Sequence, residues 1–178
     1  MVTSRTAKRY SREDAQTIIA KLKTKPFEDL HPLFKEGSLP SFYEIEGDTT
    51  GSLLPWDPET PWWVKLQSVI LFDSPLGRWT GKRFMTPFNE GKRGKGINLF
   101  QNRVLPRRFR FDTSIQKAQA DQKPCLVLDY VHLPLSLFSI RDELRKIDDG
   151  VFLGQGYAKL PWDKEHFLLV YFAICALQ

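Results

Sequence analysis

A carboxylate lies inside an otherwise apolar stretch of the chain. Asp129 follows Cys125-Leu126-Val127-Leu128 and precedes Tyr130. A carboxyl group in apolar surroundings has a raised pKa and can act as a general acid or base. The next charged segment offers partners for it, namely Arg141, Asp142, Glu143 and Arg145. We favour a structural network instead, in which Asp129 or Glu143 pairs with Arg141, Arg145 or Arg83.

Metal and nucleophile chemistry have little support. His31, His132 and His166 have no Cys or carboxylate beside them at zinc spacing, which excludes a structural zinc site. A haem would need one histidine inside a cavity, and we expect ordinary surface or strand-end histidines instead. Cys125 and Cys175 lie in apolar runs, where a thiol packs as a small hydrophobe. No nucleophile motif such as G-x-S-x-G is present, and no cofactor is expected.

Two basic segments could bind anions. Residues 89–96 are glycine-rich and basic but lack the G-x-x-x-x-G-K-[ST] spacing, so we expect a hairpin loop and not a phosphate cradle. A second segment mimics a stacking surface for single-stranded nucleic acid. Strand alternation, however, puts Phe109 and Phe111 on the face opposite Arg108 and Arg110. Nucleic acid is therefore not the expected partner; the second segment contains Phe100, Arg103, Arg107, Arg108, Phe109, Arg110 and Phe111.

Charge is segregated along the chain. The net charge is +5, yet residues 26–77 sum to −7 and residues 78–123 to +9. Neighbouring elements of one fold can carry such complementary charges. The alternative is a positive face for an anionic partner such as a membrane surface.

Length and composition indicate a single globular domain. The chain has 178 residues, of which 42% are hydrophobic and 26% charged, which excludes a disordered polyampholyte. We expect a flexible tail over 1–10 and one domain over 11–178. The longest apolar run, 167–177, is shorter than the ~18 residues of a spanning helix, and no signal-peptide pattern opens the chain. A cytoplasmic location is expected.

The predicted helices all lie in the first half of the sequence. Ser11 precedes a predicted helix over 12–24. A second short helical segment is interrupted by Pro32 and ends at Gly37. A third helix is predicted near 61–72 after Thr60. The apolar faces of the three comprise Ala15, Ile18, Ile19 and Leu22; Phe27, Leu30, Leu33 and Phe34; and Trp62, Trp63, Leu66, Val69 and Ile70.

From residue 78 the pattern changes to that of strands. The turn signal Asp148-Asp149-Gly150 favours a strand before it, although Ile140, Leu144 and Ile147 have helical spacing. Several short antiparallel strands indicate a barrel or sandwich. We predict a mainly β protein, an antiparallel barrel with its N-terminal helices packed on or capping it. The predicted strands are 42–46, 78–86, 96–101, 107–116, 124–131, 150–158 and 166–175.

The last strand is apolar on both faces. Leu168, Val170, Phe172 and Ile174 alternate with apolar neighbours, so one face should line the barrel and the other needs a cover. We expect the helix with Trp62 and Trp63, or the helix with Ile18 and Ile19, to cover it. A homodimer interface is the alternative.

Several segments resemble a known family. Gly77-Arg78-Trp79-Thr80-Gly81 spells G-x-W-x-G and continues as Lys82-Arg83-Phe84. With Leu128-Asp129-Tyr130, 133–135, Phe138, 141–150 and Leu153-Gly154, it resembles the family named for its GXWXG motif. The family's G-x-W-x-G segment precedes a W-x-G-K-x-F segment, whereas Trp79 here matches the second. The resemblance implies a calycin-like barrel, similar to lipocalins and fatty-acid-binding proteins, with no established activity.

The leading functional hypothesis is non-catalytic binding of a small, mostly apolar ligand inside the barrel. Arg141 or Arg83 would anchor a carboxylate or phosphate group on that ligand. One alternative is an isomerase or cyclase with Asp129, Tyr130 or His132 facing the same cavity. Another is a module that binds an anionic surface through residues 78–123. The residues expected to line or plug the cavity are Trp79, Phe109, Phe111, Tyr130, Tyr157 and Phe172.

Overall fold

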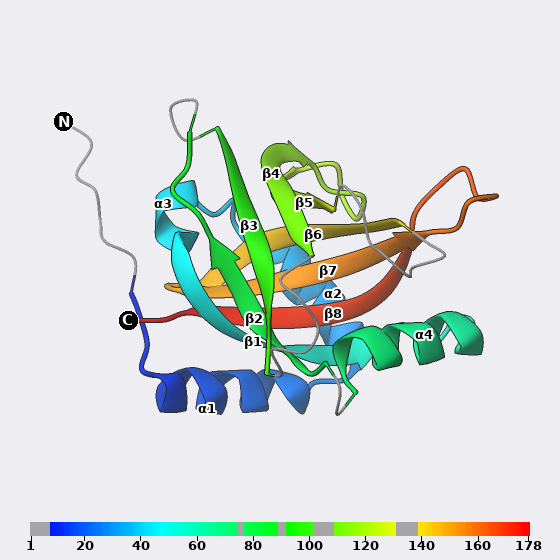
Figure 1. The fold of residues 1–178 in the computed structure, drawn as a ribbon, viewed down its shortest axis with the longest axis horizontal. Helices are drawn as coiled ribbons and strands as arrows, with labels where there is room; N and C mark the ends of the chain where they lie inside the picture. Colours follow the sequence, from blue (N-terminus) through cyan, green and yellow to red (C-terminus); the bar gives the residue numbers. More distant parts are fainter. Residues whose placement is uncertain (1–7, 75–76, 89–91, 102–108, 131–138) are drawn as a thin grey trace.

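Eight antiparallel strands close into a barrel in the computed structural model (Figure 1). Each strand pairs with its neighbours in the sequence, and β8 pairs with β1 to complete the ring. The mainly β, antiparallel barrel predicted from the sequence is confirmed. The structure describes residues 8–74, 77–88, 92–101, 109–130 and 139–178.

The elements alternate little between helix and strand. Three of the described helices precede the first strand and a fourth follows it, after which the remaining strands succeed one another. The helices are α1 (Arg12–Lys23), α2 (Phe27–Glu36), α3 (Phe42–Ile45) and α4 (Trp62–Phe72). The strands are β1 (Gly47–Trp56), β2 (Trp79–Phe84), β3 (Arg93–Phe100), β4 (Arg110–Lys117), β5 (Pro124–Tyr130), β6 (Ser139–Asp148), β7 (Val151–Lys159) and β8 (Phe167–Ala176).

Side chains of β8 alternate between the two sides of the barrel wall. Phe172 and Ile174 pack in the interior cluster, whereas Tyr171, Ala173 and Cys175 pack in a cluster outside it. A strand in contact with protein on both faces is apolar throughout, which explains the continuous apolar run at the end of the chain.

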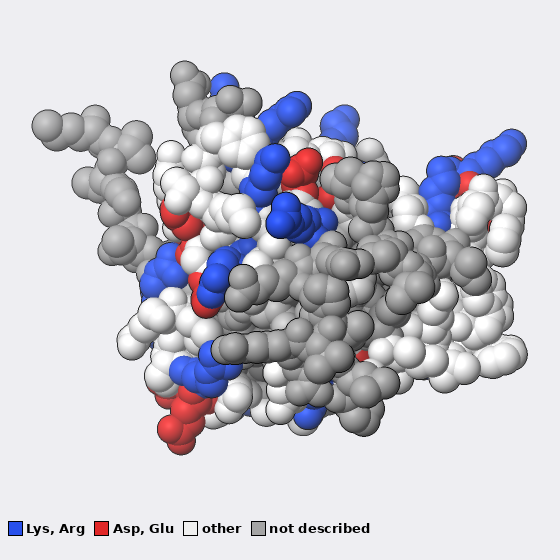
Figure 2. Space-filling model, in the orientation of Figure 1, with Lys and Arg blue, Asp and Glu red and all other residues white. Residues whose placement is uncertain are grey.

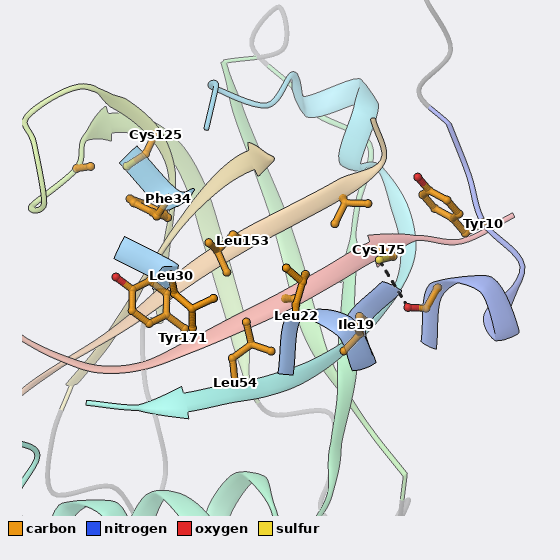
Figure 3. Close-up of a cluster of buried hydrophobic side chains, with 14 of the residues drawn as sticks. Tyr10, Ile19, Leu22, Leu30, Phe34, Leu54, Cys125, Leu153, Tyr171 and Cys175 are labelled. Atoms are coloured by element: carbon orange, nitrogen blue, oxygen red, sulfur yellow. Dashed lines mark hydrogen bonds between the residues drawn. The ribbon is translucent and has the colours of Figure 1, made fainter. Parts of the chain in front are cut away.

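The helices α1 and α2 cover that outer face (Figure 3). Ile19 and Leu22 of α1 lie against β8 and β1, and the Cys175 thiol is 3.9 Å from the Ala15 carbonyl. Phe27 of α2 meets the Tyr171 ring edge-on at 5.2 Å. Of the two helices expected to cover the last strand, it is therefore the one with Ile18 and Ile19 that does so.

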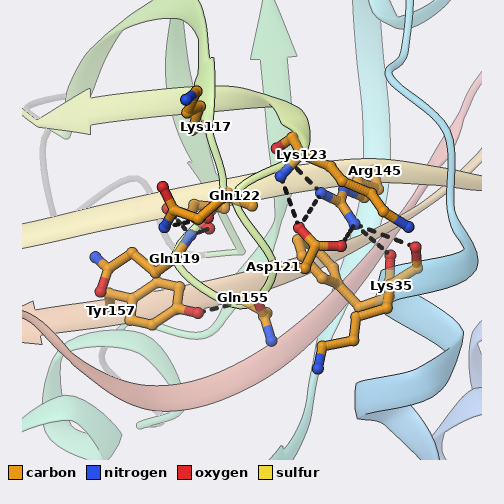
Figure 4. A network of polar contacts seen from close by, with 12 residues as sticks. Lys35, Lys117, Gln119, Asp121, Gln122, Lys123, Arg145, Gln155 and Tyr157 are labelled. Atoms are coloured by element: carbon orange, nitrogen blue, oxygen red, sulfur yellow. Dashed lines mark hydrogen bonds and ion pairs between the residues drawn. The ribbon is translucent and has the colours of Figure 1, made fainter.

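Arg145 fastens α2 to the barrel (Figure 4). This β6 side chain is 1% exposed, and its guanidinium donates to the carbonyls of Phe34 and Lys35 at the C-terminal end of the helix. It also donates to both carboxylate oxygens of Asp121 at 2.6 and 2.7 Å. This hydrogen bonding lowers the pKa of Asp121 to about 2. A cation at a helix C-terminus is favourable, so one residue joins three segments.

The chain is already held at residue 8 to 10, inside the expected flexible tail. Tyr10 forms a bridge with Leu177, and its hydroxyl donates to the Asp149 carbonyl at 2.9 Å. Arg9 donates to the carbonyls of Glu46 and Leu177. The rest of the expected tail lies outside the described residues.

Two local predictions are wrong. Residues 42–46 were expected to form a strand, but most of them form α3, because Ser41 and Glu44 make a reciprocal capping box. Pro32 does not interrupt α2, which runs from Phe27 to Glu36 around it. The first strand is instead β1, whose Gly51 and Pro55 hide the usual strand pattern.

The helix α4 turns a different face to the barrel than its sequence suggested. Val64 and Ser68 are fully buried, whereas Trp62, Leu66 and Ile70 are 75%, 51% and 56% exposed. The helix is apolar on almost every side, so periodicity alone could not choose the buried face. It also begins one residue later than predicted, with Pro61 as the N-cap.

Replacing Ile19 with alanine should destabilise the protein by roughly 2–5 kcal/mol, because it leaves a cavity between α1 and β8. Denaturant unfolding would measure the loss, with the exposed residue Lys21 replaced by alanine as the control. Deletion of residues 1–25 should be still more destabilising. If Ile19→Ala cost no more than Lys21→Ala, the covering role of α1 would be refuted.

Replacing Asp121 with asparagine should cost about 2 kcal/mol at pH 7, because one of the two hydrogen bonds to Arg145 is lost and the other is made to a neutral amide instead of a carboxylate. The carboxyl pKa is lowered in the folded state, so its contribution is present above pH 4 and disappears as the pH falls from about 4 to 2. Urea unfolding across this range should show the wild type and the variant converging. A difference that stays constant down to pH 2 would contradict the ion pair.

Candidate functional site

A lysine lies inside the barrel. Lys82 of β2 is 3% exposed, and a glycine explains how it comes to face inward together with Trp79. The two residues are three positions apart, which in a regular strand would put them on opposite faces. The pairing of β2 with β3 shifts between Trp79 and Gly81, and Gly81 has a φ of +149°. A Cβ on Gly81 would lie 2.2 Å from the Thr49 carbonyl oxygen, so this bulge requires glycine.

The Lys82 ammonium group has a full set of acceptors. It donates to Asn98 Oδ1 at 2.9 Å, to the Tyr130 hydroxyl at 2.6 Å and to Asp142 Oδ2 at 2.8 Å. An ammonium group has three N–H donors, so all of them are used. The Tyr130 hydroxyl in turn donates to Asp142 Oδ2 at 2.8 Å. Lys82, Asn98, Tyr130 and Asp142 are called the polar cluster below.

Aromatic rings surround the ammonium group. Its Nζ lies 5.0–5.3 Å from the ring centroids of Trp79, Phe111, Tyr130 and Phe172. The Trp79 indole N–H donates to Asn98 Oδ1 at 3.0 Å, which orients both the ring and the amide. Phe172 fits because Gly154 faces it: a Cβ there would lie 2.1 Å from the ring. The polar cluster is thus surrounded by apolar side chains inside the barrel.

Burial governs the titration of the cluster. Burial lowers the pKa of Lys82, although Asp142 opposes this effect. Burial and the Asp142 carboxylate raise the pKa of Tyr130 well above its usual value, so the phenol keeps its proton at neutral pH. One ammonium and one carboxylate are paired, and the cluster as a whole is neutral.

A cavity of about 40 Å³ adjoins the cluster. Lys82, Asn98, Tyr130 and Asp142 form its polar side, and apolar residues form most of the remainder. Helix α4 closes it with Ser68 and Phe72, whose ring packs on Phe100 and Phe109. The volume is enough for one or two water-sized groups. The other lining residues are Leu53, Trp56, Trp79, Ile140, Gly156, Leu169, Val170 and Phe172.

Three polar positions at this cavity have unused hydrogen-bonding capacity in the contacts between described residues. The Ser68 hydroxyl is buried and has no hydrogen-bond partner among the described residues. The hydrogen bonds between described residues use Oδ2 of Asp142, not Oδ1. Asn98 uses one amide hydrogen, in a 3.2 Å bond to Tyr130. A molecule placed here could both donate and accept hydrogen bonds.

Three residues expected from the sequence line the cavity, namely Trp79, Tyr130 and Phe172. Phe111 lies in the interior cluster behind them, in edge contact with Tyr130 at 5.6 Å. Phe109 packs on the rings of Phe72 and Phe100 at the same end of the barrel.

The other expected residues lie outside the barrel. Arg141 and Tyr157 alternate with the inward-facing Asp142 and Gly156, and therefore point away from the interior. Arg141 pairs with Glu143 at 3.1 Å, and the Tyr157 hydroxyl donates to Gln155 at 3.0 Å (Figure 4).

The remaining charged candidates are also outside the cavity. Arg83 pairs with Asp48 on the surface. Asp129 accepts a hydrogen bond from Gln116 at 3.2 Å in an exposed position. His132 and the arginines at 103, 107 and 108 lie outside the described residues.

Sequence reasoning missed Lys82, Asn98, Asp142 and Ser68 as site residues. A signal for two of them was present, because Lys82 belongs to the W-x-G-K-x-F segment and Asp142 to the 141–150 segment that carry the family resemblance. The structure brings these two segments together at 2.8 Å. Asn98 and Ser68 carry no such signal.

The described residues contain no group of three or more His, Cys, Asp or Glu side chains that could hold a metal ion. Likewise, none of the helices described is long and apolar enough to cross a membrane.

Comparison with known proteins supports the fold alone. No family model matches the chain, and no curated protein matches it either. A crystal structure of a protein from Thermomonospora curvata is similar, with a TM-score of 0.52. The similarity covers 92% of this chain and 95% of that chain at 13% sequence identity. At this identity the two chains share an architecture, and the similarity says nothing of activity.

Replacing Lys82 with methionine should cost about 3–5 kcal/mol, because it leaves the Asp142 carboxylate buried without its counter-ion. The double variant Lys82→Met/Asp142→Leu should recover most of that loss, since neither charge remains. Urea unfolding of both variants would measure this, with the exposed Lys95→Met as the control. If the double variant were less stable than Lys82→Met, the two residues would not form the pair described.

Proposed function

We propose that the barrel binds a small, neutral, mostly apolar molecule that carries one hydroxyl group. The observation that carries this proposal is the buried Ser68 hydroxyl, which lacks a partner among the described residues and lines the same cavity as Asp142 and Asn98. Burying a hydroxyl without a hydrogen bond costs about 1–3 kcal/mol. A ligand hydroxyl between Ser68 and Asp142 would recover that cost.

Charge balance favours a neutral ligand over the anionic head group considered from the sequence. The Lys82 ammonium already has three acceptors, one of which is the Asp142 carboxylate. An entering carboxylate would find no N–H of Lys82 available and would meet a like charge in apolar surroundings, where repulsion is strong. Arg83 and Arg141 lie outside the barrel and pair with carboxylates there.

The size of the cavity implies that α4 moves when a ligand enters. Pockets for small molecules usually measure ~300–1,000 Å³, far more than the 40 Å³ found here. Helix α4 is the wall best suited to yield, because it buries only Val64 and Ser68 completely among its described side chains. Its movement would open the cavity toward the side of Phe72.

Catalysis in the same cavity is the second candidate and has weaker support. An isomerase or cyclase would need a group ready to move a proton. Tyr130 does face inward, but its hydroxyl is committed to Asp142 and its raised pKa keeps it protonated. Asp129 faces outward. Membership of the GXWXG family remains a prediction.

Cyclohexanol should raise the melting temperature of the protein more than methylcyclohexane or cyclohexanecarboxylate does, because only the alcohol can bond Ser68 and Asp142 without adding charge. Ligand-observed NMR would give the affinities, and we expect the carboxylate to bind at least about tenfold more weakly, a difference of ~1.4 kcal/mol.

Two variants of Ser68 separate binding from folding. Ser68→Ala should leave the stability of the protein unchanged or raise it, because an unpaired buried hydroxyl is removed. The same variant should bind cyclohexanol several-fold more weakly. Ser68→Leu should fill the cavity and abolish binding. The proposal fails if cyclohexanecarboxylate binds as tightly as cyclohexanol, or if Ser68→Leu binds the alcohol as well as the wild type.

A further inference from the structure

The wall of the barrel opens between β1 and β2. The two strands pair at Gly47 with Phe84 and at Asp48 with Arg83, whereas β1 stays paired with β8 as far as Trp56. Beyond Asp48, β1 and β2 are no longer paired residue by residue, and threonine side chains of β1 contact backbone carbonyls of β2 instead. Thr49 Oγ1 donates to the Lys82 carbonyl at 2.8 Å, and Thr50 Oγ1 reaches the Thr80 carbonyl at 3.5 Å. The strands therefore separate, and a gap forms on the outer surface.

A hollow of about 450 Å³ lies at this gap, between α1 and the beginning of β2. Its volume falls within the usual ~300–1,000 Å³ range of small-molecule sites. Its floor is formed by residues 50–52 of β1 and by Trp79 and Thr80 of β2. Figure 1 shows α1 running along the outside of the barrel beside β1. The hollow is thus built from segments that the fold holds in fixed positions.

Every charged residue that lines the hollow is a cation. Arg12 and Lys23 extend from α1, and Arg78 comes from the segment before β2. Among the described residues, no carboxylate lines it. Arg78 does approach Asp73 at 3.8 Å, but both side chains are more than half exposed, so that contact is weak. Three cations along one concave surface create a positive potential there.

Trp79 offers little surface to the hollow. The residue lines both the hollow and the interior cavity, but it is only 6% exposed, and its indole N–H bonds Asn98 inside the barrel. Most of the other residues that line the hollow are polar or charged. The hollow therefore suits a polar, charged ligand.

We propose that this hollow binds a small anion with phosphate or carboxylate groups. Lys23 and Arg78 would hold the charged oxygens, and Arg12 would add to the positive potential. The site stands on residues other than those of the polar cluster, and it does not depend on the function proposed for the interior.

Inorganic pyrophosphate and citrate are suitable probes, because one carries phosphate and the other carboxylate oxygens. Isothermal titration near ~0.15 M salt, where long-range attraction is screened, would measure their binding. The double variant Lys23→Gln/Arg78→Gln should lower the affinity for the more tightly bound probe at least about tenfold, because it removes two charged hydrogen-bond donors. The probe that binds more tightly would show whether the hollow prefers phosphate or carboxylate groups.

The matched control is Lys95→Gln/Arg110→Gln. It removes the same charge from the exposed face of β3 and β4, over which Figure 2 shows several Lys and Arg side chains. We expect it to leave the affinity within about twofold of the wild type, as for surface charges outside the site. Equal loss in both double variants would mean diffuse attraction and would overturn the proposal, as would failure of both probes to bind the wild type.

Discussion

The interior of the barrel depends on one buried ion pair, between Lys82 and Asp142. Lys82 can stay ionised inside the barrel only because Asn98, Tyr130 and Asp142 each accept one of its N–H groups. Removing an ammonium group from water costs several kcal/mol unless it is fully paired. These partners come from β3, β5 and β6, so the requirement fixes how four strands face one another across the interior.

This pairing also decides what the interior can accommodate. A cluster that is internally neutral and satisfied has little attraction for a charged ligand, but it leaves single hydrogen-bonding positions on Asp142 and Asn98. Ser68 of α4 lines the same cavity. Anion-binding capacity lies elsewhere, in the hollow lined by Arg12, Lys23 and Arg78 on the outer surface. The barrel wall thus separates two sites of opposite chemical preference.

The fold was predictable from the sequence because period-two patterns and turn signals act locally. The same reasoning placed Trp79, Tyr130 and Phe172, which line the cavity. It missed Lys82 because a Gly81 bulge changes which face the lysine occupies, and a strand pattern cannot show a bulge. It misplaced Arg141 and Tyr157 because a shift of one residue moves a whole strand's side chains to the other face. It could not orient α4, whose residues are apolar almost all round.

The most direct test of this account is a crystal structure of the protein with cyclohexanol. We predict the ring against Trp79 and Phe172, on the side of α4, with its hydroxyl within hydrogen-bond distance of Ser68 Oγ and Asp142 Oδ1. Lys82 should keep its three acceptors, and α4 should lie further from the barrel. The account would be contradicted if the alcohol displaced Asp142 from Lys82, or if it bound only outside the barrel while the interior stayed unchanged.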